Sequence, residues 1–306
     1  MRGALKRRPV IAVPVTAPLT ASVAAPVAAP AYVFQGHSGA RVEFHPDAKL
    51  VRKTAAAPHA NDRLQAQSEK QRRLFMLGLP FPRVLAERVN KEGCAEFDMQ
   101  YLPGRSLADA VSKAAIFDPG TVVKSVERMM WLFAPAAGLP LAPHFFQNKI
   151  RAIAQEASGD VRQAAARLSA LNWRGIPESP CHGDLTLENM LITTAKTVAF
   201  IDCDEAWVSS YWLDFGKLFQ DIEGHWCLRR LYAPQVPQAQ RVNAIQKMEP
   251  LGRAFRALAA RTDTVLLERL PQLAALGLLR AIPYAKDPDT IAFICKRIAH
   301  LLEKAS

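Results

Sequence analysis

The side chains with the clearest chemistry stand in two short stretches of the chain. Residues 181–189 read Cys-His-Gly-Asp-Leu-Thr-Leu-Glu-Asn, and residues 200–204 read Phe-Ile-Asp-Cys-Asp. An aspartate such as Asp184 can orient a hydroxyl group and accept its proton. Amide and carboxylate oxygens, here those of Asn189 and Asp202, are ligands that Mg²⁺ accepts beside nucleotide phosphates. Together these groups predict phosphoryl transfer, a reaction in which the protein mainly positions the reactants and neutralises charge.

The segment between Asn189 and Asp202 is typical of a β-hairpin. Residues 190–192 form a short apolar run, residues 193–196 a polar turn, and residues 198–201 a second apolar run. A turn centred between positions 195 and 196 would put Asn189 opposite Asp202, and directly opposed residues lie about 5 Å apart. We therefore expect both side chains to reach one cation, with Asp184 on the loop that leads into the hairpin.

Each of these residues also has an ordinary structural explanation. Taken alone, Asp184 reads as a turn residue and Asp202 as a residue that ends a strand. The joint spacing favours the catalytic interpretation, because a His-x-Asp is followed five residues later by Asn189 and then by an apolar run that ends in Asp-x-Asp.

This combination resembles the aminoglycoside phosphotransferase and choline kinase superfamily, small-molecule kinases with a protein-kinase-like fold. The catalytic segment of that family reads His-Gly-Asp-Leu-x-x-x-Asn and its metal segment Ile-Asp-x-Asp. The resemblance implies Asp184 as the catalytic base, Asn189 and Asp202 as Mg²⁺ ligands, and Asp204 as a supporting or second-metal carboxylate. It implies that His182 props the loop, and it covers roughly residues 33–224.

Upstream, residues 36–39 form a Gly-rich turn between alternating segments, followed by residues 41–45 and 49–53 as two further strands. Gly36, Ser38 and Gly39 would let backbone N–H groups approach phosphate oxygens, as in the phosphate loop of the resembled family, although such a turn is usually only a turn. Lys53 shares a strand face with Val51 and is expected to reach the ATP phosphates.

The other side chains near Lys53 carry further expectations. Arg52 points to the opposite strand face and is expected to be a solvated charge. A helix from Asn61, as N-cap, through Met76 carries Glu69, and the resemblance implies an ion pair between Glu69 and Lys53. The alternative for Glu69 is a surface carboxylate, the usual position of a glutamate.

Residues 96–102 alternate as a strand that ends at a Pro-Gly pair. In the resembled family this segment joins the two lobes. The resemblance implies that backbone groups from Gln100 to Leu102 bind adenine and that Met99 lines the pocket. Packing of Met99 and Tyr101 in a core is the open alternative.

Two rival functions are weighed against a small-molecule kinase. The triplet Asp214-Phe215-Gly216 matches the metal-binding triplet of protein kinases, but it falls within residues 211–222, which follow helical spacing. We expect Asp214 to brace the catalytic loop from that helix. The Ala-Pro-Glu that closes a protein-kinase activation segment is missing, which disfavours a protein kinase. The set of Lys53, Glu69, Asp184, Asn189 and Asp202 disfavours a non-catalytic nucleotide-binding protein.

Composition agrees with a kinase of this type. A chain of 306 residues with 50% hydrophobic residues can bury a full core and suits two lobes. Five scattered cysteines without a Cys-x-x-Cys pair fit a reducing compartment, so we expect a cytoplasmic enzyme. The sequence has no run of 18 apolar residues, so we expect no transmembrane helix. The net charge is +11, but the sequence has no dense run of basic residues interleaved with aromatic ones, so we expect no nucleic-acid partner.

The predicted fold class is α+β, with a protein-kinase-like arrangement. Residues 1–30 are expected to be a disordered, Pro/Ala-rich basic leader, residues 31–102 a small β-rich nucleotide-binding lobe, and residues 103–306 a larger, mostly helical catalytic lobe. The expected helices of the larger lobe span 121–133, 145–171, 211–222, 242–258, 264–279, with a break or kink at Pro271, and 290–302.

The acceptor is expected to be a small-molecule hydroxyl, with a sugar or polyol as the first choice. Aromatic and acidic residues just after the metal segment could line its pocket, although core packing is the alternative for most of them. These residues are Trp207, Tyr211, Trp212, Asp221, Glu223 and Trp226. ATP and Mg²⁺ are the expected cofactors, and the oligomeric state is left open.

Overall fold

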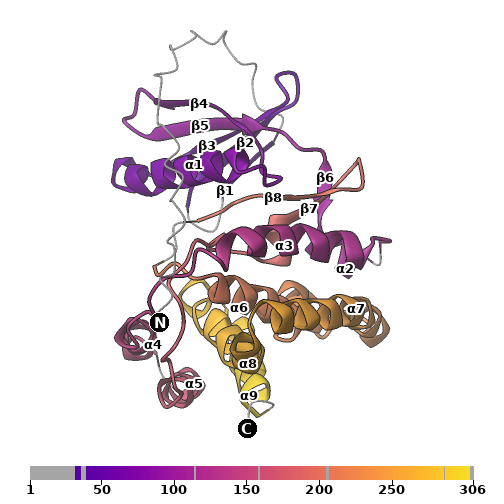
Figure 1. Cartoon of the computed structure of the whole chain (residues 1–306). Helices are drawn as coiled ribbons and strands as arrows, with labels where there is room; N and C mark the ends of the chain where they lie inside the picture. Colours follow the sequence, from indigo (N-terminus) through magenta and orange to yellow (C-terminus); the bar gives the residue numbers. More distant parts are fainter. Residues whose placement is uncertain are drawn as a thin grey trace, which may run out of the picture.

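The chain forms a small lobe built on an antiparallel sheet, followed by a larger helical lobe, which confirms the predicted α+β class (Figure 1). The computed structural model describes residues 32–35, 39–113, 115–157, 159–204, 207–285 and 287–303. The predicted leader, 1–30, and two residues of the predicted phosphate loop, Gly36 and Ser38, lie outside the described residues. Within the described ranges, no helix is both long enough and apolar enough to cross a membrane.

Five strands form the sheet of the small lobe, in the order β1-β2-β3-β5-β4. They are β1 Tyr32–Gln35, β2 Arg41–His45, β3 Leu50–Thr54, β4 Val84–Val89 and β5 Ala95–Gln100, and every pair is antiparallel. Helix α1, Asn61–Met76, follows β3. Leu64 of α1 packs with Phe97 and Met99 of β5 in the core of this lobe.

The register of β3 decides which of its two cationic residues faces α1. Lys53 is opposite Phe97 of β5, whereas Arg52 is opposite Asp98, so the two side chains point to opposite faces, as predicted. Arg52 is not a solvated charge, because its Nε donates to Asp98 Oδ1 at 2.8 Å and Arg88 binds the same carboxylate. Only the face of Arg52 was therefore predicted correctly.

The helical lobe begins with a second, three-stranded sheet, which Figure 1 shows between the first sheet and the helices. Its strands are β6 Gly104–Ser106, β7 Met190–Thr193 and β8 Val198–Phe200. The helices are α2 Leu107–Ser112, α3 Pro119–Phe133, α4 His144–Gln155, α5 Gly159–Ser169, α6 Tyr211–Ile222, α7 Gln238–Thr262, α8 Thr264–Leu279 and α9 Pro288–Glu303. Short 3₁₀ turns η2 Leu187–Asn189, η3 Trp226–Tyr232 and η4 Ile282–Tyr284 connect them.

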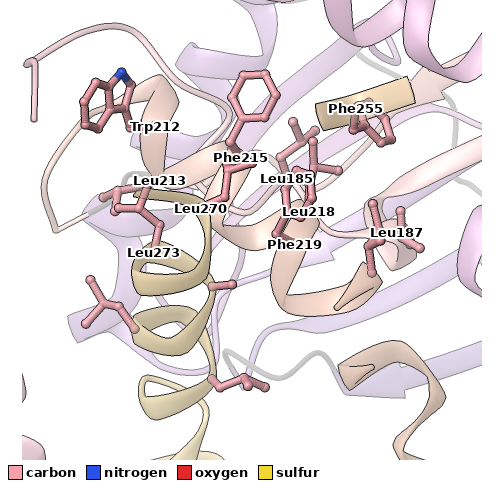
Figure 2. Packing of buried hydrophobic residues seen from close by; sticks show 14 of the residues in the cluster. Leu185, Leu187, Trp212, Leu213, Phe215, Leu218, Phe219, Phe255, Leu270 and Leu273 are labelled. Carbon is pink, nitrogen blue, oxygen red and sulfur yellow. The ribbon is translucent and has the colours of Figure 1, made fainter. Parts of the chain in front are cut away.

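The core of the helical lobe is built around α6, which is buried over nearly its whole length against α8. Figure 2 shows Phe215, Leu218 and Phe219 of α6 among the side chains of this cluster, with Leu270 and Leu273 on α8. Gly216 allows the close approach of the two helices, because a Cβ atom there would lie 2.9 Å from Leu273 Cβ. Helix α6 is therefore held rigidly at the centre of the lobe.

Three expectations about helices differ from the structure. The predicted helix 145–171 is two helices, with α4 ending at Gln155 and α5 beginning at Gly159, whose φ of 54° favours a break. Helix α8 continues through Pro271, at the loss of one backbone hydrogen bond. Asn61 is not the N-cap of α1; its side chain instead accepts from Ala95 N at 2.7 Å and so ties the helix to β5.

Replacing Gly216 by alanine should lower the free energy of unfolding, because the added methyl group would have to displace α8. Overpacking of a tight core typically costs about 1–3 kcal/mol. Denaturant unfolding followed by circular dichroism measures the change. The matched control is Gly138→Ala, since a Cβ atom at that position would have its nearest neighbour 3.8 Å away. Equal losses in both variants would contradict the tight contact between α6 and α8.

Candidate active site

Two buried carboxylates of α6 hold the loop that contains Asp184. Asp214 accepts hydrogen bonds from His182 N at 2.6 Å and from Gly183 N at 2.9 Å. Asp221, two helical turns later, accepts from Leu187 N at 2.7 Å. Burial raises the pKa of both carboxyl groups to about 7, although these N–H donors favour the ionised form. The prediction that Asp214 braces the loop is confirmed.

Gly183 brings the two chemically important stretches side by side. Its φ is 94°, and a Cβ atom on it would overlap the carbonyl oxygen of Asp204. Asp204 N also donates to His182 O at 3.0 Å. Because a larger residue would separate these two segments, glycine is required at this position. His182 itself is fully buried, and burial lowers its pKa to about 4, which fits a neutral structural role.

Asp184 lies between an amide and a lysine. Asn189 Nδ2 donates to Asp184 Oδ2 at 2.9 Å and to its backbone oxygen at 2.8 Å, and Lys217 Nζ lies 3.1 Å from Oδ1. Burial alone would raise the pKa of Asp184, but the charge and hydrogen bond of Lys217 outweigh it and hold that pKa below its ordinary value. The side chain remains 38% exposed, so a reactant can reach it.

Lys217 is a functional residue that the sequence patterns did not single out. It lies on α6 between Asp214 and Asp221, at the three- and four-residue spacing that places side chains on one helix face. Since Asp214 was already expected to contact the catalytic loop, this spacing was the signal that could have found Lys217.

The predicted register of the hairpin is wrong by one residue. Met190 pairs with Phe200 and Ile192 with Val198, so Asn189 is opposite Ile201, whose N–H donates to Asn189 O at 3.0 Å. The reason is the turn, which has Lys196 in the left-handed region at φ 59° and is longer than a two-residue turn. Asp202 nevertheless lies close enough to Asp184 for its charge to act on the pKa of that carboxyl group.

Asp202 joins the two lobes through β3 and α1. Its Oδ1 binds Lys53 Nζ and accepts from Gln67 Nε2 at 2.9 Å, and Gln67 Oε1 lies 3.4 Å from Lys53 Nζ. Burial opposes ionisation of Asp202, but the charge of Lys53 outweighs it and lowers the pKa of this carboxyl group. Asp202 has a left-handed φ of 60°, and its side chain is 49% exposed. Strained backbone of this kind often occurs at functional sites.

The predicted ion pair between Lys53 and Glu69 is wrong. Glu69 is exposed on α1, and Gln67 occupies the position beside Lys53. The physical reason is helical rotation: residues two apart point in nearly opposite directions, so Glu69 turns away when Gln67 faces Asp202. The alternative of a surface carboxylate holds for Glu69.

Helix α1 makes further contacts with the metal segment. Arg63 Nη2 lies 2.7 Å from Asp204 Oδ2 and its Nε 3.3 Å from Oδ1, so Arg63 binds both carboxylate oxygens. The buried Lys70 donates to Asp204 O at 2.6 Å. Asp204 therefore ties α1 to the helical lobe, and this engagement does not favour the metal-ligand role expected for it.

The predicted adenine-binding segment has only part of its backbone available. Gln100 N donates to Arg83 O at 2.9 Å and Tyr101 N to Lys49 O at 3.0 Å. Leu102 N forms no hydrogen bond with another described residue. Met99 packs in the core of the small lobe, where Gln71 Nε2 lies 3.5 Å from its sulfur. Gly39, the described glycine of the predicted phosphate loop, has a φ of 83° just before β2.

Most of the residues expected at the acceptor pocket are structural. Tyr211, Trp212 and Asp221 are buried in the helical lobe, because they lie on the inward faces of α6. Glu223 forms an ion pair with Arg256. The ring of Trp226 stacks with Arg229, whose Cζ is 4.2 Å from the ring centroid. The core alternative therefore holds for the first three. Trp207 is half-buried and packs against the core, with its ring centroid 5.4 Å from that of Phe146, and Arg280 Cζ lies 5.5 Å from the same indole ring.

The donor set fits Mg²⁺ in number and type. Asn189 uses its amide nitrogen on Asp184, so its Oδ1 forms no hydrogen bond with another described residue. Asp202 binds Lys53 and Gln67 through Oδ1, and its Oδ2 likewise forms no hydrogen bond with another described residue. Two hard oxygen donors suit an ion that keeps several waters and shares phosphate oxygens. Among the described residues no group of three His, Cys, Asp or Glu side chains could hold a metal without such help.

Two solved structures show what the chain is similar to. One is aminoglycoside phosphotransferase APH(3'')-Id from Streptomyces rimosus ATCC10970, with 19% identity, a TM-score of 0.50, and coverage of 88% of this chain and 92% of that chain. The other is a thermostable mutant of aminoglycoside phosphotransferase APH(4)-Ia in ternary complex with AMP-PNP and hygromycin B, with 17% identity, a TM-score of 0.54, and coverage of 91% and 95%. At these identities the likeness shows a shared fold.

The comparison by sequence defines the family. No curated protein matches the chain. A model described as the phosphotransferase enzyme family matches residues 34–258, which include β2, β3, the loop with Asp184 and the whole of α6. Because that match spans more than half of the 306 residues, the chain belongs to the phosphotransferase enzyme family and is a phosphotransferase.

Proposed function

We propose that the protein transfers the γ-phosphate of ATP to a hydroxyl group of a small molecule, with Mg²⁺. The observation that carries this proposal is the meeting of two pairs from different parts of the chain. Asp184 is hydrogen-bonded to Asn189, and Asp202 is bound by Lys53 of the small lobe. A base, a cation for phosphate and two oxygen donors for metal are the groups that phosphoryl transfer requires.

The small lobe would bind the nucleotide. We assign the adenine contact to the backbone around Leu102, whose N–H is free among the described residues, and the phosphate contact to Lys53. Gly36, Ser38 and Gly39 remain our proposal for the phosphate loop. Met99 is not retained as a pocket residue, because it packs in the core. The complex of APH(4)-Ia contains AMP-PNP, which supports a nucleotide here.

Asn189 Oδ1 and Asp202 Oδ2 would hold Mg²⁺, which when bound supplies positive charge to the phosphate oxygens. Asp202 also keeps Lys53 in position through their ion pair. Asp204 is left out of the metal site, because both of its oxygens contact Arg63.

Asp184 would orient the acceptor hydroxyl and take its proton as the new O–P bond forms and the bond from the γ-phosphorus to the bridging oxygen of ADP breaks. Asn189 fixes the carboxylate by its hydrogen bond to Oδ2. Lys217 holds the pKa of Asp184 below its ordinary value, so the base is ionised at neutral pH.

The acceptor class follows from the family and from the solved structures of similar fold. Two complexes of APH(4)-Ia contain hygromycin B, one with ADP and one with AMP-PNP, and they support a small-molecule hydroxyl here. A sugar or polyol is our first choice, and a cytoplasmic location goes with the need for ATP.

The proposed function is tested by transfer of radiolabelled phosphate from ATP to pools of small hydroxyl compounds, with protein substrates in the same assay. Asp184→Asn should reduce transfer by about 10²-fold or more, because the amide cannot accept the proton. It should largely spare ATP affinity, since an amide oxygen can still accept from Asn189. Equal labelling by wild type and variant, or labelling of protein substrates alone, would refute the proposal.

The metal assignment predicts opposite results for two neighbouring aspartates. Asp202→Asn should weaken Mg²⁺-ATP binding markedly and raise the Mg²⁺ concentration needed for activity, because it removes a charged ligand and the partner of Lys53. Asp204→Asn should leave the Mg²⁺ requirement nearly unchanged and lower thermal stability, since it breaks the contact with Arg63. Titration calorimetry with Mg²⁺-ATP separates the two, and a shared Mg²⁺ defect would return Asp204 to the metal site.

The pKa of Asp184 predicts a shift in the pH profile. Lys217 lowers that pKa, so in the wild type the acid limb of kcat/KM lies below the ordinary titration range of aspartate. Lys217→Met removes the positive charge, raises the pKa of Asp184 and should move the acid limb to higher pH. Lys217→Arg should restore most of the wild-type profile, and Lys91→Met, in an exposed turn, should not move it. An unmoved limb in Lys217→Met would show that Asp184 is not the titrating base.

A further inference from the structure

Cationic side chains from four separate elements act on three neighbouring carboxylates, those of Asp184, Asp202 and Asp204. Lys53 comes from β3, Arg63 and Lys70 from α1, Lys217 from α6, and Arg280 from the residue that caps α8. This arrangement differs from a surface of scattered charges, because the elements are far apart in the sequence and meet at one site. Its electrostatic field therefore favours negative ligands.

Four of the five cations already have a role within the protein. Lys53 binds Asp202, Lys217 binds Asp184, and Arg63 binds Asp204. Lys70 is buried, donates to Asp204 O at 2.6 Å, and its charge acts on the buried carboxyl group of Asp214. These four either hold the catalytic carboxylates or fasten α1 to the helical lobe.

Arg280 differs from the other four, because it forms no ion pair or hydrogen bond with another described residue through its side chain. Its Cζ lies 5.5 Å from the ring centroid of Trp207, and its position is fixed by the backbone bond of its N–H to Leu276 O at the end of α8. Burial lowers its pKa from the ordinary value, which shows a guanidinium partly removed from water. A partly desolvated cation that forms no ion pair or hydrogen bond with a described residue is costly unless a ligand pairs with it.

The carboxylate charges that act on Arg280 associate it with Asp184 and not with the pair of Lys53 and Asp202. Among the carboxylates whose charge acts on Arg280, Asp184 comes first and Asp204 second, and the exposed ring of Tyr284 is close to it as well. Asp184 is the group that we assign to the acceptor hydroxyl. Lys53, by contrast, pairs with Asp202, on the side that we assign to the nucleotide.

We propose that the acceptor carries an anionic group, a carboxylate or a phosphate, in addition to the hydroxyl that receives the γ-phosphate, and that Arg280 binds this group. The inference rests on the proposed function and narrows its substrate class. The planar guanidinium matches both oxyanions with paired hydrogen bonds.

The same charges argue against a polycationic acceptor. Asp184, Asp202 and Asp204 are each bound by a lysine or arginine, so an ammonium group would have to compete with a cation of the protein at each of these three carboxylates. A cationic acceptor would also have to approach Arg280 and Lys217. Like charges at such short range disfavour binding.

The first experiment compares acceptors of one ring type that differ in charge: glucosamine, glucose, glucuronate and a hexose phosphate. Radiolabelled transfer by the wild type should favour an anionic member by about tenfold or more, since hydrogen bonds to charged groups are the stronger class. Preference for glucose or glucosamine would overturn the inference, while leaving the proposed phosphotransfer intact. The choice between glucuronate and the hexose phosphate identifies the anionic group.

The second experiment tests Arg280 itself. Arg280→Gln should raise KM for the preferred anionic sugar about tenfold or more and leave KM for ATP unchanged, and Arg280→Glu should shift the preference toward glucosamine. Arg253→Gln is the matched control, because that arginine is 72% exposed on α7 and forms only a long contact with Glu249. A rise in KM for ATP in Arg280→Gln would assign this residue to the nucleotide and overturn the inference.

A binding measurement covers the case in which none of the four sugars accepts phosphate. Inorganic phosphate and acetate are titrated into the protein in complex with Mg²⁺ and AMP-PNP, whose γ-phosphate fills the nucleotide side of the site. The wild type should bind one of the two anions at least about tenfold more tightly than Arg280→Gln. Equal affinity in the two proteins would overturn the inference without any turnover, whereas lack of transfer with intact anion binding would count only against the proposed reaction. Circular dichroism and unfolding curves verify that each variant is folded.

Discussion

The loop that contains Asp184 depends on one buried carboxylate, that of Asp214, which accepts hydrogen bonds from the N–H groups of His182 and Gly183. A loop that turns sharply leaves backbone donors without partners, and an unsatisfied buried donor costs about 1–3 kcal/mol. Helix α6 supplies the carboxylate from the most rigid position available, at the centre of the larger core and against α8. The conformation of the loop is thus set by a buried helix, and the same helix supplies Lys217, which contacts Asp184.

The two lobes meet through polar contacts of α1. Gln67, Lys70 and Arg63 bind the side chains or backbone of residues 202–204. Contacts of this kind are directional, and they bring β3 and Lys53 into register with Asp202. Because the contacts lie on one face of one helix, a small rotation of α1 would change the position of Lys53 and the metal segment together. The glutamine at position 67 binds Lys53 and Asp202 at once, as an amide can both donate and accept.

The electrostatic character of the site follows from the same arrangement. Asp184 and Asp202 each have a cationic neighbour, which keeps the carboxyl groups ionised despite their burial. Arg280, on which the charge of Asp184 acts, adds a charge that no described residue pairs with. The site therefore combines groups that we assign to phosphoryl transfer with a charge that, by our proposal, distinguishes acceptors, and these two tasks are carried by different elements.

The sequence by itself determined the family, the α+β class and the closeness of Asp184 to the amide of Asn189, because these depend on local spacing within one loop and its hairpin. It also identified Asp214 as a brace, since the helical period ties that residue to α6. Local spacing did not determine the hairpin register, because that register depends on the turn in which Lys196 has a positive φ. It also did not determine the partners of Lys53, which are Asp202 and Gln67 and not Glu69. Only the tertiary structure decided that Lys217 and Arg280 lie near Asp184, because the rotation of each helix about its axis is set by packing against the whole core, and periodicity specifies a buried face but not the partners that it meets.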